Sequence, residues 1–484
     1  MSKENSTFKD FQHLLHEVNR FILIMNEGRF SEISRHDSLF LINNSNGAGH
    51  TIIGRTGSQI LNRIAKRALN TDEDIRYRAC VQTVRKTIEW YFSDQILKSR
   101  KELTPALAKK IIAKSVKHVR DKKIKSVTHY IPCILALESD RTEFSIGPVR
   151  FQTTEAFFEK NKSKISEHTK STETKFIKDE KSIALGKRSR LLPTKKNEWP
   201  LLEIKKSAIY FEESLREYFK SYRWVASTKT NRFDTATSKR VARASIETAL
   251  NILRLFIGAY HADHFRLGGG FRDESRSVTL TEDQEGKLLI SISSKSEDAT
   301  LGKDWLNFVF SPESGQWVQI AGSLIHIMQS GTNVPLLYQR LIDALWWYGE
   351  AVCEPLPNVK VIRYANALEV FLGTSAQDIS HQLALRASYL CSDDVLAEGT
   401  EWYDKVKRFY DARSRLVHGR LSPMDLEIDE YVALGEQLTS KVLMEGLSWT
   451  MYLAHQNHRM GEREIARHFE QHLPWFSFHM VASH

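Results

Sequence analysis

Four amphipathic segments occupy most of the last third of the chain, and they constrain its fold more than any other feature. Apolar side chains recur at helical spacing over residues 336–352, 361–373, 400–419 and 426–453. Short connections that contain proline or glycine separate several of these segments, and strand-forming patterns largely vanish after Val334. Because helices joined by short loops pack as antiparallel neighbours, the sequence predicts a helical bundle over residues 331–484.

The residues before this bundle mix helical and strand patterns, so the predicted fold class is α+β. Helices are predicted at residues 8–24, 57–69, 72–92, 104–125 and 235–260. A glycine-rich loop is predicted at residues 43–57. Strand-forming runs on both sides of Glu138–Arg141 predict a hairpin over residues 129–151. Residues 277–294, with Gly286 near the turn, predict a second hairpin.

The predicted helix at residues 104–125 has the clearest local signals. Thr104 suits the N-cap, and Pro105 suits the first helical position. Lys110, Lys114 and Lys117 follow one another at i, i+4 and i+7 and form a cationic ridge. The ridge suits phosphate binding, although a solvated helix face has the same pattern.

Positive charge is concentrated in two blocks of the first half. Residues 100–125 contain 10 basic and 2 acidic residues, and residues 160–196 contain 12 and 4. Residues 331–484 contain 14 basic and 20 acidic residues. Basic blocks attract polyanions, either nucleic acid or an anionic membrane, and a solubilising surface is the alternative. The second block is poor in core-forming residues, which predicts a cationic linker or loop.

These patterns divide the chain into four predicted ranges. Residues 1–158 are expected to form a mixed N-terminal domain with the basic helix, and residues 159–200 the cationic linker. Residues 201–330 are expected to form a middle α/β domain, and residues 331–484 the helical bundle. A length of 484 residues accommodates this number of domains.

Composition and cysteine usage predict a cytoplasmic protein with no membrane partner. Hydrophobic residues make up 41% and charged residues 26% of the chain, which is ordinary for a globular protein. The start lacks a basic-then-apolar signal pattern, and no apolar run approaches the ~18–20 residues of a membrane span. The 4 cysteines stand far apart without metal-ligand or redox spacing, as is typical of free thiols in a reducing compartment.

One arginine breaks the pattern of the third amphipathic segment. With Trp402 as origin and ~100° per residue, the apolar residues cluster around an arc near 20°, and Arg413 lies in the middle of it. A guanidinium on a core-facing stripe is costly unless it is paired or faces a cleft or an interface. His418 follows five residues later, and Gly419 suits the position after the helix end.

An arginine and a histidine supply what metal-free RNA cleavage needs. The arginine binds a phosphate and offsets negative charge in the transition state. The histidine, with an unperturbed pKa of ~6.5, exchanges protons with the 2′-hydroxyl or the leaving 5′-oxygen. The alternative is a structural arginine paired with Asp411 or Asp404, beside a histidine that the helix dipole favours.

Residues 331–484 resemble a HEPN domain of the Apea-like type. The segments that carry the resemblance are RLIDALWWYGEA (340–351), RYANALEVFLG (363–373) and RFYDARSRLVHGRL (408–421). The last segment contains an Arg-x4-His motif from Arg413 to His418. The residues before about position 330 resemble no family.

The resemblance implies an all-α bundle and a metal-independent endoribonuclease without a cofactor. It implies Arg413 and His418 as the catalytic pair, with Ser414, Arg415 and Glu369 in supporting positions. Members of the family often form homodimers that bring two such motifs into one cleft. Many act in bacterial anti-phage defence, abortive infection or toxin–antitoxin systems, which implies a phage-derived trigger. Some members only bind RNA or a protein, so a non-catalytic binding module is the alternative.

The expected substrate is RNA, such as tRNA or mRNA, held by basic residues in both halves of the chain. The expected RNA-binding residues are Lys110, Lys114, Lys117, Arg408 and Arg420. In this hypothesis the first half captures a polyanion or senses a trigger, and the bundle cuts.

Three further motifs are weaker. His261, Asp263 and His264 have a spacing that suits a metal, but neither an HExxH motif nor a second carboxylate cluster supports a site there. The glycine-rich residues 47–57 lack the GK[ST] of a phosphate-binding loop. The pair Trp346–Trp347 suits base stacking, although paired aromatics on an amphipathic helix more often belong to a core or an interface.

Overall fold

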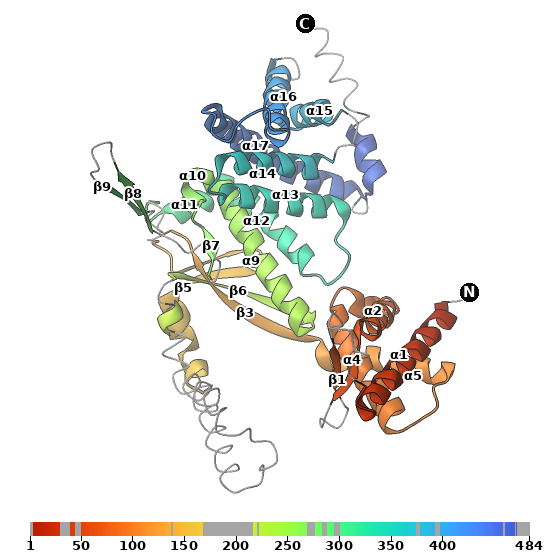
Figure 1. The fold of residues 1–484 in the computed structure, drawn as a ribbon. Coiled ribbons are helices and arrows are strands. Elements are labelled where there is room, and N and C mark those ends of the chain that lie inside the picture. Colours follow the sequence, from red (N-terminus) through yellow and green to blue (C-terminus); the bar gives the residue numbers. More distant parts are fainter. Residues whose placement is uncertain are drawn as a thin grey trace. The chain divides into compact units, whose positions relative to one another are not determined.

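The computed structural model describes most of the chain. The described residues are 3–29, 39–43, 50–136, 139–167, 216–219, 222–268, 276–282, 288–294, 301–373, 378–392, 397–457, 460–469 and 471. The chain forms two compact units (Figure 1). Unit 1 consists of residues 1–129, 229–244 and 328–333, and unit 2 of residues 130–228, 245–327 and 334–484. Unit 1 thus gathers segments from three of the four predicted ranges, and the separate folding of those ranges stays a prediction.

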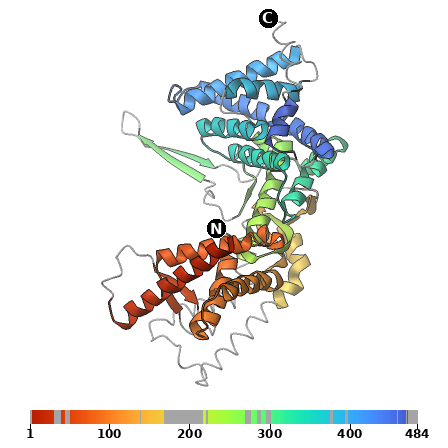
Figure 2. The same cartoon turned by 90° about the vertical axis from the view of Figure 1, so that its right-hand side faces the viewer.

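Unit 1 is mainly helical and has one apolar core. Its elements are α1 (Lys3–Asn26), β1 (Phe40–Asn43), β2 (His50–Ile53), α2 (Arg55–Leu69), α3 (Glu73–Arg76), α4 (Val81–Phe92), η2 (Ser93–Lys98), α5 (Pro105–His118) and η3 (Val119–Lys123). Helices α1, α2, α4 and α5 pack against one another and bury Phe11, Ile64 and Phe92 between them (Figure 2, red to orange). The predicted helices at residues 8–24 and 57–69 are confirmed.

Two predictions for unit 1 are wrong. The predicted loop at residues 43–57 contains β2, which pairs with β1, and the start of α2. The predicted helix at residues 72–92 is divided into α3 and α4. The second helix begins at Cys80, whose backbone N–H donates to the Asp234 carboxylate at 2.9 Å. A cap supplied from 154 positions along the chain leaves no local pattern to detect.

Helix α5 begins as the sequence predicts. The side chain of Thr104 accepts a hydrogen bond from the backbone N–H of Leu107 at 3.2 Å, and Pro105 is the first helical residue. Ala108 and Val116 are buried, so the apolar side of this helix faces the core of unit 1.

A five-stranded sheet takes its strands from both sides of the predicted linker. The strands are β3 (Lys125–Ile134), β4 (Glu143–Ile146), β5 (Val149–Thr153), β6 (Trp224–Phe233) and β7 (Arg266–Leu267), in the order β4-β5-β6-β3-β7. β3 continues from unit 1 into unit 2 at Tyr130, and β6 continues back into unit 1 at Lys229.

The hairpin predicted over residues 129–151 has different partners in the structure. β4 and β5 form an antiparallel hairpin across Gly147 and Pro148, whereas β3 lies between β6 and β7. The sequence does not predict β6. Its first five residues are all buried, so it lacks the alternation that marks a half-buried strand.

The second predicted hairpin and the long helix between the two hairpins are confirmed. β8 (Arg276–Glu282) pairs antiparallel with β9 (Leu288–Ser294), while Gly286 lies outside the described residues. The long helix is α9 (Thr235–Ile257), and α10 (Ala259–Ala262) follows it. Residues 154–167 are helical, so the predicted linker at 159–200 begins within a helix, and its remainder lies outside the described residues.

The C-terminal region is helical, as predicted. Its helices are α13 (Leu336–Val352), α14 (Pro357–Leu372), α15 (Ile379–Cys391), α16 (Ala397–Val417) and α17 (Glu427–Asn457), preceded by α11 (Trp305–Val309) and α12 (Pro312–Met328). α14 packs against α13 and α17, and α16 packs against α15 and α17 (Figure 1). The sequence does not predict α15, whose buried side includes the small residues Ala384, Ala387 and Ser388. In the part of the chain that the structure describes, no helix is long and apolar enough to cross a membrane.

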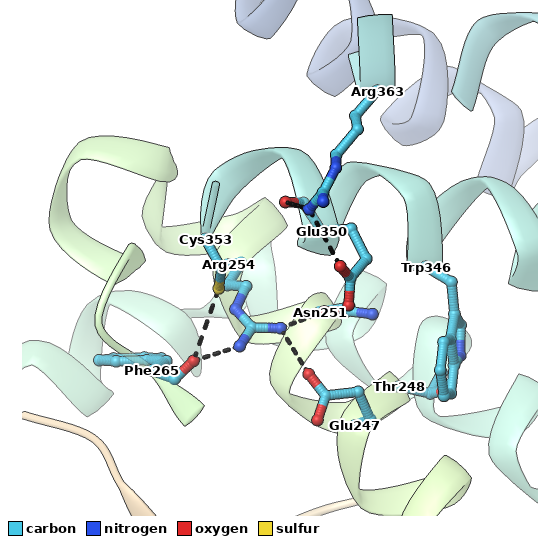
Figure 3. A network of polar contacts seen from close by, with 9 residues as sticks. All are labelled: Glu247, Thr248, Asn251, Arg254, Phe265, Trp346, Glu350, Cys353 and Arg363. Carbon is cyan, nitrogen blue, oxygen red and sulfur yellow. Dashed lines mark hydrogen bonds and ion pairs between the residues drawn. The ribbon is translucent and has the colours of Figure 1, made fainter. Parts of the chain in front are cut away.

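A buried arginine joins α9 to the rest of unit 2 (Figure 3). Arg254 is 2% exposed, and its guanidinium donates to Glu247 at 2.9 Å, to Asn251 and to the backbone carbonyl of Phe265. On the neighbouring helix α13, Trp346 donates its indole N–H to Thr248 of α9 at 2.9 Å. The bond between Trp346 and Thr248 thus joins α9 to α13, whereas Arg254 joins α9 to the segment at Phe265.

Candidate functional site

Helix α16 carries both residues of the candidate catalytic pair. Val406, Phe409 and Tyr410 of the predicted apolar arc are buried, and they pack α16 against its neighbours in unit 2. Arg413 follows on the same side of the helix, and its side chain is 22% exposed. The arc therefore turns the guanidinium toward the interior of the bundle, as the sequence pattern predicts.

Arg413 is held by Glu369 and Tyr410. Its Nη2 atom lies 3.1 Å from Oε1 of Glu369, on α14, and the Tyr410 hydroxyl donates to the same oxygen at 2.9 Å. The guanidinium carbon lies 5.3 Å from the centre of the Tyr410 ring. Burial and the hydrogen bond to Glu369 raise the pKa of Tyr410 to about 12, so the phenol stays protonated and donates. The partner of Arg413 is thus Glu369, and not Asp411 or Asp404.

One donor of Arg413 is unused. Its Nε atom is buried and has no hydrogen-bond acceptor among the described residues. A buried N–H costs about 1–3 kcal/mol until a ligand, a second chain or an ordered water supplies the acceptor, and the Nε atoms of Arg78 and Arg254 share this feature.

His418 occupies the C-cap of α16. Gly419 has φ +69°, and its backbone N–H donates to Leu416 O at 3.2 Å, while the N–H of Arg420 donates to Arg415 O at 2.7 Å. These two bonds form a Schellman motif, so the predicted glycine at the helix end is confirmed. The side chain of His418 is exposed, and no hydrogen-bond partner for it occurs within the described ranges.

Arg413 and His418 have different surroundings within a single chain. Arg413 faces α14, whereas His418 is exposed after the last turn of α16. An open groove in unit 2, with a volume of about 430 Å³, lies elsewhere between α9, α12, α16 and α17. Trp402, Phe256 and Lys441 contribute to it, and neither member of the candidate pair does.

Two residues predicted to support the pair, Ser414 and Arg415, lie in the last turns of α16, and the predicted RNA-binding residues Arg408 and Arg420 lie before and after them. The backbone carbonyl of Ser414 accepts from the N–H of His418 at 3.0 Å. Arg415 lies 3.9 Å from Glu427, and Arg408 lies 3.2 Å from Glu430, both across the connection to α17. Arg420 is exposed beside His418. The end of α16 therefore presents several cations to solvent, two of them in weak surface ion pairs.

Three large apolar side chains are exposed around the same helix end. Val417 is 51%, Met424 88% and Leu426 92% exposed. They lie on both sides of His418 in the chain, in the last turn of α16 and in its connection to α17. A second molecule that covered this part of the chain would bury these side chains, which favours its binding. Met424 lies between the predicted amphipathic segments 400–419 and 426–453, so no helical pattern marks it.

The predicted lysine ridge lies in unit 1. Lys110, Lys114 and Lys117 are exposed on α5, and none forms an ion pair with a described residue. The ridge and the Arg413–His418 pair thus belong to different units.

The competing metal hypothesis finds no geometric support in the described residues. His264 Nδ1 lies 3.3 Å from Asp263 Oδ1, but no group of three His, Cys, Asp or Glu side chains in the described ranges is arranged to hold a metal ion. The thiols of Cys80, Cys133, Cys353 and Cys391 form no disulfide with one another. Of the pair Trp346–Trp347, Trp346 is partly buried and bonds to Thr248 of α9, whereas Trp347 is 38% exposed.

Comparison with known proteins adds no family. No protein-family model matches the chain, and neither a curated protein nor a solved structure matches it. The chain is an α+β protein with a helical C-terminal region, and its activity has to be inferred from its own residues.

Proposed function

We propose that the chain is a metal-independent endoribonuclease in which Arg413 and His418 carry the reaction, on a HEPN-type bundle. The observation that carries the proposal is the exposed imidazole at the C-cap of α16, five residues after an arginine with an unused donor. Both residues stand amid surface cations that favour a phosphate.

The reaction needs no cofactor, because RNA carries its own nucleophile. His418 accepts the proton of the 2′-hydroxyl, whose oxygen attacks the adjacent phosphorus as the bond to the 5′-oxygen breaks. The leaving 5′-oxygen takes a proton from an imidazolium, so the products are a 2′,3′-cyclic phosphate and a 5′-hydroxyl. Arg413 neutralises the charge that develops on the phosphorane oxygens.

Glu369 and Tyr410 would orient the guanidinium for this role. Their shared contact uses one side of it, through Nη2. The remaining N–H groups are available to a phosphate oxygen, and Nε already lacks an acceptor among the described residues.

A homodimer would complete the site. In a single chain Arg413 faces α14 and His418 faces solvent, so the pair needs a second copy to meet around one phosphodiester. The exposed side chains of Val417, Met424 and Leu426 give that second copy an apolar surface to cover. In a two-fold dimer the same patch meets itself, so each chain contributes one half of the site.

The expected substrate is cellular RNA, such as tRNA or mRNA, cleaved in a bacterial cytoplasm. Growth arrest by this cleavage, released by a phage-derived trigger, would be an anti-phage defence of the abortive-infection or toxin–antitoxin kind. This context follows from the HEPN resemblance of RFYDARSRLVHGRL.

An RNase assay with and without EDTA tests the proposal. We expect EDTA-resistant cleavage to 2′,3′-cyclic phosphate ends, lowered about 10²–10⁴-fold by His418→Ala, which is the range for loss of a general acid or base. Arg413→Ala should lower it comparably. His455→Ala removes another exposed histidine of unit 2 and should leave the rate unchanged. Cleavage that EDTA stops, or that survives His418→Ala, contradicts the proposal.

A non-catalytic RNA- or protein-binding module is the second candidate. The ion pair between Arg413 and Glu369 favours it, because a paired, half-buried arginine is what a purely structural role requires. Binding of RNA without any cleavage by the wild-type chain would decide for this candidate.

A further inference from the structure

An exposed aromatic group lies where α4 and α5 of unit 1 pack together. Trp90 on α4 is 41% exposed, and its ring centre lies 4.7 Å from that of Tyr91 and 6.3 Å from that of His118 on α5. The Tyr91 and His118 rings are 6.0 Å apart and nearly perpendicular. Three aromatic rings from two packed helices thus adjoin one another at the surface, with the largest of them open to solvent.

Lysines surround this aromatic group. Lys86 is exposed one helical turn before Trp90, and Lys114 is exposed one turn before His118. Lys122 and Lys123 of η3 are close enough to contribute to the lowering of the pKa of His118, after its burial. Asp121 acts on His118 in the opposite sense, and Asp94 lies one helical turn after Trp90.

The arrangement matches a surface for single-stranded nucleic acid. An exposed indole offers a face on which an unpaired base stacks, and lysines on both sides offer charge to the phosphates. Duplexes do not suit it, because their bases already stack on one another. A solubilising helix surface accounts for the lysines alone, whereas single-strand binding uses both the lysines and the aromatic face beside them.

We infer that this face of unit 1 binds single-stranded RNA, with a base stacked on Trp90 and the backbone held by Lys114 and its neighbouring lysines. The inference goes beyond the proposed function. It assigns a binding surface in a different unit, and it needs neither Arg413 nor His418 nor any cleavage.

Fluorescence anisotropy of the full chain tests the inference. The probe is a labelled 2′-O-methyl oligouridine of about 20 nucleotides, the site size of one or two single-strand modules. This probe has no free 2′-hydroxyl, so binding is measured whether or not the chain is a nuclease. Trp90→Ala should weaken binding about tenfold, since loss of one stacked base is a change of this size. Trp90→Phe keeps an aromatic face and should stay within about twofold of wild type.

The matched control is Trp347→Ala. Trp347, on α13 of unit 2, is 38% exposed, close to the 41% of Trp90, and the control variant should bind the probe as wild type does. In the double variant Lys114→Ala/Lys117→Ala, the logarithm of the binding constant should depend less steeply on the logarithm of the salt concentration. The slope should flatten by about 0.7 for each phosphate that the protein no longer neutralises. Circular dichroism of each variant shows whether it is folded.

Three results would overturn the inference. The first is wild-type affinity in folded Trp90→Ala. The second is equal affinity for the single strand and for the same sequence in a duplex. The third is Trp90-dependent binding to phosphatidylserine vesicles without binding to the oligonucleotide, which would assign the surface to a membrane instead.

Discussion

The carboxylate of Asp234 accepts hydrogen bonds from backbone N–H groups at the starts of two helices. One oxygen accepts the backbone N–H of Thr237 at 2.7 Å, in the first turn of α9, and the other accepts that of Cys80 at 2.9 Å, at the start of α4. A single side chain of unit 1 therefore caps the starts of both α4 and α9. Burial by itself would raise the pKa of Asp234, but hydrogen bonds from Thr83, Cys80 and Thr237 outweigh it and lower the pKa below its ordinary value of 3.8.

Asp234→Asn should lower the free energy of unfolding by about 1–2 kcal/mol at pH 7, because its amide nitrogen cannot accept a hydrogen bond. The pKa of Asp234 is lower in the folded state than in the unfolded state. The stability that its carboxylate contributes is therefore complete above the ordinary pKa of 3.8 and is lost as the pH falls through the folded-state pKa. Urea unfolding followed by circular dichroism, at pH 7 and at steps below about pH 4, measures the difference. A difference that stays constant down to about pH 2 contradicts the argument. Asp121→Asn, at an exposed position, serves as the control and should change stability by less than about 0.5 kcal/mol.

At the scale of elements, the contact between α9 and α13 depends on a missing side chain. A Cβ atom on Gly349 of α13 would lie 1.8 Å from Oδ1 of Asn251 on α9. One turn earlier the indole of Trp346 donates to Thr248, and Arg254 lies one turn beyond Asn251 (Figure 3). The two helices approach so closely at Gly349 that only glycine leaves room for the Asn251 amide.

Gly349→Ala should therefore destabilise unit 2 by about 1–3 kcal/mol, the cost of overpacking, even though alanine favours a helix by about 1 kcal/mol. Gly315→Ala is the matched control. Its Cβ would lie 3.4 Å from the nearest atom, so the helix preference should dominate and stability should not fall. Thermal unfolding of the two variants measures the difference. Equal unfolding temperatures for Gly349→Ala and Gly315→Ala would falsify the close approach of α9 and α13.

At the scale of the whole molecule, the nuclease site in our proposal is that of a homodimer. The unused Nε of Arg413 and the exposed residues Val417, Met424 and Leu426 both point to a second chain. A two-fold arrangement would place the arginine of one copy with the histidine of the other. Two different inactive variants could then restore an intact site in a mixed dimer, which a site within one chain does not allow.

Mixing two inactive variants distinguishes these arrangements. A dimer of Arg413→Ala with His418→Ala contains one site with both residues mutated and one with both intact. We expect an equimolar mixture, after exchange of subunits, to regain about a quarter of the wild-type cleavage rate, while each variant alone stays inactive. Light scattering checks that dimers form. No recovery in mixed dimers, or full activity of a wild-type monomer, would sink the composite site.

Local chemistry determined much of the secondary structure. The spacing of apolar residues predicted α1, α2, α9, α13 and most of α14, α16 and α17, because a helix that buries one face needs that spacing wherever it packs. The Thr104 cap and the glycine at the end of α16 were predictable for the same reason: each contact lies within a few residues of the chain. The same arc of α16 indicated that Arg413 faces the interior.

Only the tertiary structure decided which distant residues and strands contact one another. The carboxylate beside Arg413 comes from another helix, the cap of α4 comes from 154 positions away, and β6 lies between β5 and β3 without a local strand pattern. The five residues from Arg413 to His418 could not show that the two side chains face different surroundings. Such pairings depend on which distant surfaces meet when the core closes, and a one-dimensional pattern does not contain that information.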